Sequence, residues 1–141
     1  MKKLKYKELI ENYSNDISHF EEKEIQSFRW VFDDINDKRN FLPVYILDEE
    51  RRINDEKKNK ATSIGYSLSL FTTLEYSKKR LMKILSDKPK AYLKLGTHIA
   101  CGNLAKDDGL CDNPNSEKHF SLFEYSDLIL ADKYNIIEKI V

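Results

Sequence analysis

Ile64-Gly-Tyr-Ser-Leu-Ser-Leu-Phe-Thr-Thr-Leu-Glu75 is the stretch that decides the fold. Apolar and polar side chains alternate along its first eight residues, which is typical of a strand with one buried face. Thr72 and Glu75 have the spacing of a capping box, in which the threonine accepts from the first helical turn and the glutamate reaches back. Apolar residues then continue at helical spacing. The stretch therefore predicts a strand over 64–71 followed directly by a helix over 73–86.

Outside this unit, other patterns predict one more helix and several strands. Apolar residues at three- and four-residue steps indicate an amphipathic helix over 3–18. The apolar run 41–47 is expected to be an edge strand or a loop against the core, because Pro43 cannot donate to a β-ladder. Further strands are expected at 28–32, at 91–95 with 97–100 as an extension, and at 119–125. Residues 134–141 are expected to be a strand, with a short helix as the alternative.

The length and composition favour one domain. A chain of 141 residues with 40% hydrophobic and 11% aromatic residues can build a core without disulfide or metal support. We expect a single α+β domain over 1–141, with a mainly antiparallel sheet of five or six strands flanked by about two helices. Residues 48–60 carry ten charges in thirteen positions and are expected to be an exposed charged loop, with an exposed helix as the alternative. Residues 101–118 are expected to be a long glycine-containing loop.

The charge balance and the terminal sequence bear on location. The 24 basic and 24 acidic residues cancel, so no overall charge attracts a polyanion. The basic start of the chain is not followed by an apolar region, and no apolar run of membrane-spanning length occurs. We therefore expect a cytoplasmic protein with no membrane association, in which the two cysteines are reduced thiols.

The stretch 96–124 concentrates residue types that carry chemistry. It holds both cysteines, two of the three histidines and three of the four glycines. Imidazole and thiolate are suitable zinc ligands, so His98, Cys101, Cys111 and His119 make a zinc-stabilised domain one alternative. No CxxC pair is present, however, and strand alternation would point His98 and Cys101 to opposite faces. The competing interpretation has packed thiols and locally bonded imidazoles, and we predict no metal site and no cofactor.

The two histidines near one loop also suit acid–base chemistry if they meet in space. Arg29, the strand with Ser67 and Ser69, and Glu124 occur in an order that resembles the arginine, serine and glutamate strands of ADP-ribosyltransferases. The resemblance implies an arginine that holds the NAD phosphates, serines that support the nicotinamide half, and a glutamate that stabilises an oxocarbenium-like transition state. It covers a few strands, and Leu122 stands where that family has glutamine or glutamate.

These observations give an enzyme alternative. It is an NAD- or nucleotide-directed transferase or hydrolase, whose predicted catalytic residues are Arg29, Ser69, His98, His119 and Glu124. Whether the chain is an enzyme stays open at this point. Convergence of these side chains on one reacting atom would be required.

The leading functional hypothesis is a small protein-interaction or accessory module. Many aromatic residues fall on predicted strands, and two helices cannot cover both faces of a sheet, so some rings are expected to be exposed and to bind a partner. The predicted binding residues are Trp30, Phe32, Phe41 and Tyr45, with 48–60 and 101–118 contributing. For any single ring, burial in the core is the competing interpretation. A protein partner is expected, nucleic acid or a nucleotide is the alternative, and the oligomeric state is left open.

Overall fold

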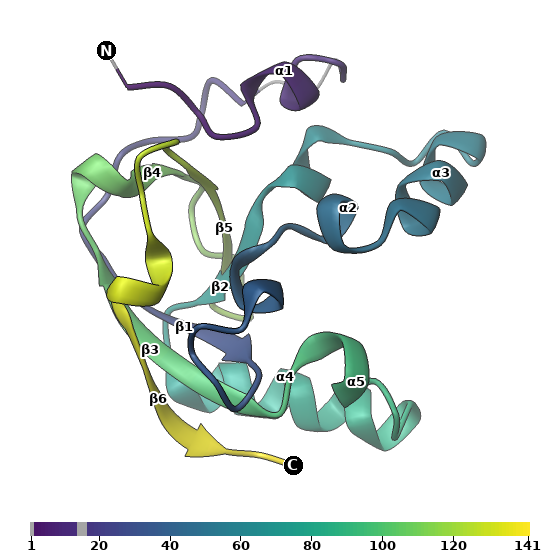
Figure 1. Cartoon of the computed structure of the whole chain (residues 1–141), viewed down its shortest axis with the longest axis vertical. Helices are drawn as coiled ribbons and strands as arrows, with labels where there is room; N and C mark the ends of the chain where they lie inside the picture. Colours follow the sequence, from purple (N-terminus) through teal and green to yellow (C-terminus); the bar gives the residue numbers. More distant parts are fainter. Residues whose placement is uncertain (1, 14–16) are drawn as a thin grey trace.

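A six-stranded antiparallel sheet is the framework of the chain (Figure 1). The computed structural model describes residues 2–13 and 17–141. Across the sheet the strand order is β4-β5-β2-β1-β3-β6. The strands are β1 (Ile25–Val31), β2 (Leu68–Phe71), β3 (His98–Leu104), β4 (Gly109–Cys111), β5 (His119–Glu124) and β6 (Tyr134–Lys139). This confirms the predicted α+β class and the mainly antiparallel sheet.

β1 lies at the centre and links the two halves of the sheet. It pairs with β2 through Phe28 and Phe71, and with β3 along its whole length. Because both neighbours run antiparallel to β1, β2 and β3 run parallel to each other with β1 between them. The connection from β2 to β3 therefore crosses over β1, and it carries the longest helix, α4 (Leu74–Asp87).

α4 covers one face of the sheet. Phe28, Phe71 and Ile99 form a buried cluster with Leu74 and Tyr76 from the helix. The helix begins at Thr73, whose side chain accepts a 3.2 Å hydrogen bond from the Tyr76 amide. The prediction of a helix over 73–86 is confirmed, but the cap is Thr73 and not Thr72.

The opposite face is covered by irregular segments. Its buried cluster contains Val31, Leu70, Ala100 and Phe120 from the sheet, with Leu130 from the turn before β6. A third cluster joins Ile10 and Phe20 of the N-terminal part to Tyr45, Tyr66 and Phe123. The remaining elements are α1 (Lys7–Ile10), α2 (Val44–Leu47), α3 (Glu49–Lys57), α5 (Tyr92–Leu95), η1 (Lys38–Phe41), η2 (Ser63–Tyr66), η3 (Lys106–Asp108) and η4 (Leu130–Asp132).

The helix predicted over 3–18 is mostly wrong. Among its described residues only Lys7–Ile10 form a helix, and residues 14–16 lie outside the described part. The cause is tertiary, because the chain before α1 pairs with the end of β5. Leu4 forms a β-bridge with Tyr125, and the Lys5 amide donates to the Glu124 carbonyl at 2.9 Å.

Two predicted non-helical segments are helices. Residues 44–47 form α2. Pro43 is its N-cap residue, and its carbonyl accepts from the Ile46 and Leu47 amides, so its missing N–H breaks no helical hydrogen bond. Residues 49–57 form the exposed helix α3, which is the alternative to the expected loop. Asp48 accepts from the Arg51 amide at its start, and Arg52 pairs with Glu49 and Glu56 one turn away on either side.

Three further segments differ from the prediction. The first half of 64–71 is the 3-10 turn η2, and 91–95 is the helix α5. The stretch 101–118 is not one long loop, because β3 continues to Leu104 and β4 lies within it. Gly109 allows close approach of strands, since a Cβ there would lie 2.3 Å from the Phe123 carbonyl oxygen. The strands predicted at 28–32, 119–125 and 134–141 are confirmed as parts of β1, β5 and β6.

Candidate functional site

A groove of about 520 Å³ opens between α1 on one side and α2 with α3 on the other. Figure 1 shows these helices above and to the right of the sheet, away from α4. We call this groove the tyrosine groove. It is lined by Leu9, Asn12, Tyr13, Tyr45, Ile46, Glu49, Arg52, Glu56 and Tyr66.

Three tyrosines from three separate segments line the groove. Tyr13 follows α1, Tyr45 lies in α2 and Tyr66 ends η2. The ring centroids of Tyr45 and Tyr66 are 5.4 Å apart in an edge-to-face contact, and Tyr13 lies 6.1 Å from Tyr66. Tyr45 and Tyr66 are buried, whereas Tyr13 is half-buried, so the first two form the floor and Tyr13 forms part of a wall.

Gly65 fixes the close approach of η2 to α2. A Cβ at this position would lie 2.2 Å from two ring carbons of Tyr45. Any larger residue at 65 would therefore push the Tyr45 ring out of the floor. The glycine is required by packing, because its own φ is not in the left-handed region.

Acidic side chains of α3 accept hydrogen bonds from two of the three tyrosine hydroxyls. Tyr13 donates to Glu56 at 2.7 Å and Tyr45 donates to Asp55 at 2.8 Å. Burial and the hydrogen bond to Glu56 raise the pKa of Tyr13 to about 12, so this hydroxyl stays protonated and remains a donor. Arg52 bonds Glu56 and Glu49, which ties the charged rim of the groove together.

Several large hydrophobic side chains around the groove are partly exposed to solvent. Among the described residues, six of the eleven exposed large hydrophobic side chains belong to α1, α2, α3 and η2. They are Leu9, Val44, Ile46, Leu47, Ile53 and Ile64. Two of them, Leu9 and Ile46, lie on opposite walls of the groove itself. A concentration of exposed aliphatic side chains is typical of a binding surface.

Glu124 and Arg29, two of the predicted catalytic residues, share the sheet face opposite α4. The Glu124 side chain is 3% exposed, and burial raises its pKa to about 7 although Lys5 and Arg29 act to lower it. Burial also lowers the pKa of Arg29 to about 10. The guanidinium donates to the backbone oxygens of Asn40 and Ser69, at 2.7 and 2.9 Å.

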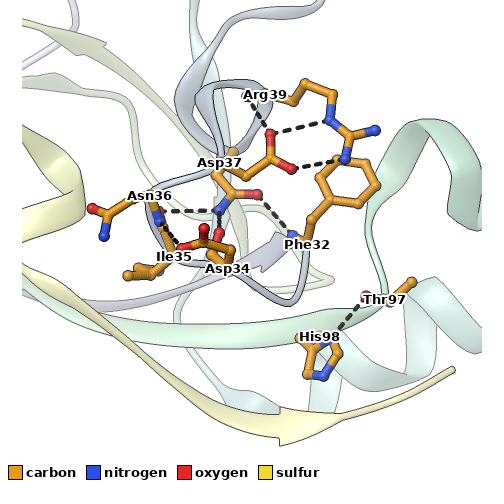
Figure 2. A network of polar contacts seen from close by, with 9 residues as sticks. Phe32, Asp34, Ile35, Asn36, Asp37, Arg39, Thr97 and His98 are labelled. Atoms are coloured by element: carbon orange, nitrogen blue, oxygen red, sulfur yellow. Dashed lines mark hydrogen bonds and ion pairs between the residues drawn. The ribbon is translucent and has the colours of Figure 1, made fainter.

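The other predicted catalytic residues lie elsewhere. Ser69 and His119 pair with Ser121 and Phe71, so their side chains point to the α4 face, away from Glu124. Burial lowers the pKa of His119, whose ring meets Phe71 edge-on at 5.3 Å. His98 is on β3, three strands away from β5, and its Nδ1 shares a 2.7 Å hydrogen bond with the Thr97 hydroxyl (Figure 2).

The two cysteines occupy opposite faces of the sheet. Cys101 packs with the cluster under α4, whereas Cys111 is buried in the cluster on the other face. Burial raises the pKa of Cys111 to about 12. Within the described residues, no three His, Cys, Asp or Glu side chains are arranged to hold a metal ion.

Three of the four predicted binding aromatics pack inward. Trp30 is half-buried and donates to the Ser77 carbonyl at 3.0 Å. Phe32 is 9% exposed and lies under the Arg39 guanidinium, 3.6 Å from the ring centroid, as Figure 2 shows. Phe41 packs on Tyr134 at 5.3 Å. Only Tyr45 of the four lines the tyrosine groove.

Tyr13, Tyr66 and Arg52 are not among the predicted site residues. In the sequence, Tyr13 falls in the helix expected over 3–18 and Tyr66 in the strand expected over 64–71. Their signal is weak, because they are 53 residues apart and only the tertiary structure brings them together with α2 and α3.

Comparison of the chain with protein-family models, with curated proteins and with solved structures finds no match. None of the helices in the described residues is long and apolar enough to cross a membrane.

Proposed function

We propose that this protein is a small protein-binding module and that the tyrosine groove is its binding surface. The observation that carries the proposal is the groove itself, an open hollow of about 520 Å³ with a tyrosine floor and aliphatic side chains on both walls. Tyrosine is enriched at binding hot spots, because its ring contributes large contact area and its hydroxyl a hydrogen bond.

The arrangement of the groove suits a side chain or short segment of a partner. Leu9 and Ile46 both line the hollow and are 37% and 39% exposed. A partner that covers them removes apolar surface from water. Glu49, Glu56 and Arg52 then form a polar rim, which is the usual anatomy of a protein interface.

The experiment compares partner capture by three forms of the chain. Ile46→Asp places a charge in one wall of the groove. Met82→Asp is the matched control, because Met82 is 57% exposed on α4, away from the groove. Each form is immobilised and exposed to native cell extract, and retained proteins are quantified by mass spectrometry.

We expect at least one retained protein to be reduced about tenfold or more by Ile46→Asp and unchanged by Met82→Asp, as for a hot-spot residue. Leu9→Asp on the opposite wall should have the same effect on the same protein. If every retained protein binds equally to the two groove variants and the wild type, the groove is not the binding surface.

A further inference from the structure

Glu124 is a buried carboxyl group that the proposed binding function does not use. Its side chain is 3% exposed, and its Oε1 has no hydrogen-bond partner among the described residues. A buried polar atom without a partner is costly, so it calls for an explanation. The cost is greatest when the carboxyl group is charged.

The N-terminal segment, residues 3–13, covers this carboxyl group. The Lys5 amide donates to the Glu124 carbonyl at 2.9 Å, and the Ser126 amide donates to the Lys3 carbonyl at 2.8 Å. These bonds add a short piece of chain to the end of β5. The same segment continues into Leu9 and Tyr13, which form one wall of the tyrosine groove.

Few charged groups face Glu124 from the elements around it. Lys5 and Tyr6 approach from the N-terminal segment, and the Lys5 ammonium is 3.7 Å from Oε2. Arg29 acts from β1, and from β4 the paired residue is Gly109, which has no side chain. The two cations do not offset burial, since the pKa of Glu124 is raised to about 7.

We propose that Glu124 is a proton-controlled latch for the N-terminal segment. When the carboxyl group is neutral, the segment seats on β5 and completes the groove wall. When it ionises, the molecule favours a state in which the segment has lifted from β5 and water reaches the carboxylate. The latch thereby regulates the tyrosine groove. This consequence rests on the proposed binding function, but the existence of the latch is independent of it.

The experiment measures amide hydrogen exchange at Lys5 and Ser126 from pH 5 to pH 8, corrected for the intrinsic pH dependence of exchange. Glu124→Gln keeps the shape of the side chain and removes its charge. In the wild type, protection of both amides should fall at least about tenfold as the carboxyl group ionises. In Glu124→Gln it should stay constant. Amides of β1, which report global unfolding, should remain better protected than Lys5 and Ser126 throughout.

Lys5→Met supplies a second test that does not alter the buried group. It removes the nearest cation, so the pH at which protection is lost should move upward. The latch is wrong if protection of the wild-type amides changes less than about twofold, or if Glu124→Gln loses protection to the same extent. It is also wrong if the Lys5 and Ser126 amides exchange only when the β1 amides do, because exchange then occurs through global unfolding. Since no partner is needed, failure here is separate from failure of the groove as a binding surface.

Discussion

The Lys5 ammonium lies 3.7 Å from Glu124 Oε2, while Glu124 Oε1 finds no hydrogen-bond partner in the described residues. A buried carboxylate needs several donors to replace water, and one exposed lysine at this distance does not supply them. Burial therefore dominates, and the pKa of Glu124 rises from 4.5 to about 7.

This pKa makes stability depend on pH. The folded state holds the proton more tightly than the unfolded state, so the contribution is fully present below pH 4.5 and is lost as pH rises through about 7. At 1.4 kcal/mol per pH unit, the loss is on the order of 3 kcal/mol. Urea unfolding at pH 5 and pH 8 should show this decrease in the wild type. Glu124→Gln should remove most of it, whereas Glu50→Gln on exposed α3 should not.

Asn40 should be the most sensitive polar residue of the β1–α2 connection. Its side chain is buried, accepts from the Phe32 amide at 2.7 Å and donates to the carbonyls of Asp34 and Ile35. Figure 2 shows this turn with its Asp37–Arg39 pair. Asn40→Ala should lower the free energy of unfolding by about 2–4 kcal/mol, because buried backbone groups lose their partners.

The matched control for Asn40 is Asn36→Ala, because Asn36 is exposed in the same turn. It should change the free energy of unfolding by less than about 0.5 kcal/mol. Equal effects of the two substitutions in urea titrations would contradict the role assigned to Asn40.

The start of α4 can be tested with adjacent threonines. Thr73 accepts from the Tyr76 amide and Thr72 does not cap the helix. Thr73→Ala should therefore destabilise the protein by about 1 kcal/mol, and Thr72→Ala by less. Thermal unfolding of the two variants side by side measures the difference, and the reverse order would restore the sequence-based assignment of the cap.

The two thiols should differ in reactivity. Cys111 is 1% exposed and its pKa is raised to about 12, whereas Cys101 is half-buried. In Cys101→Ser, iodoacetamide at pH 8 should leave the folded protein unlabelled, because the thiolate is both scarce and inaccessible. The same variant unfolded in guanidinium should be labelled fully. Rapid labelling of Cys111 in the folded protein would show that this core opens readily.

Local pattern determined the α+β class and most of the sheet. Alternation along 28–32 and 119–125 predicts strands because successive side chains of a strand point to opposite faces of the sheet. The 73–86 stripe predicts α4 because one face of this helix packs against the sheet. The helix α3 is difficult to predict from the charged stretch 48–60. An exposed helix that is stabilised by ion pairs has no apolar stripe that would mark it in the sequence.

Tertiary structure decided the N-terminal segment and the candidate site. Residues 3–5 have a helical pattern, but pairing with the end of β5 replaces local hydrogen bonds with longer-range ones. The sequence predicts Tyr45 as a binding residue, but it gives no sign that Tyr13 and Tyr66 lie beside it. The three tyrosines form one groove only because α1, α2 and η2 meet there. A local pattern records which side of an element is buried, and it carries no information on which distant element covers it.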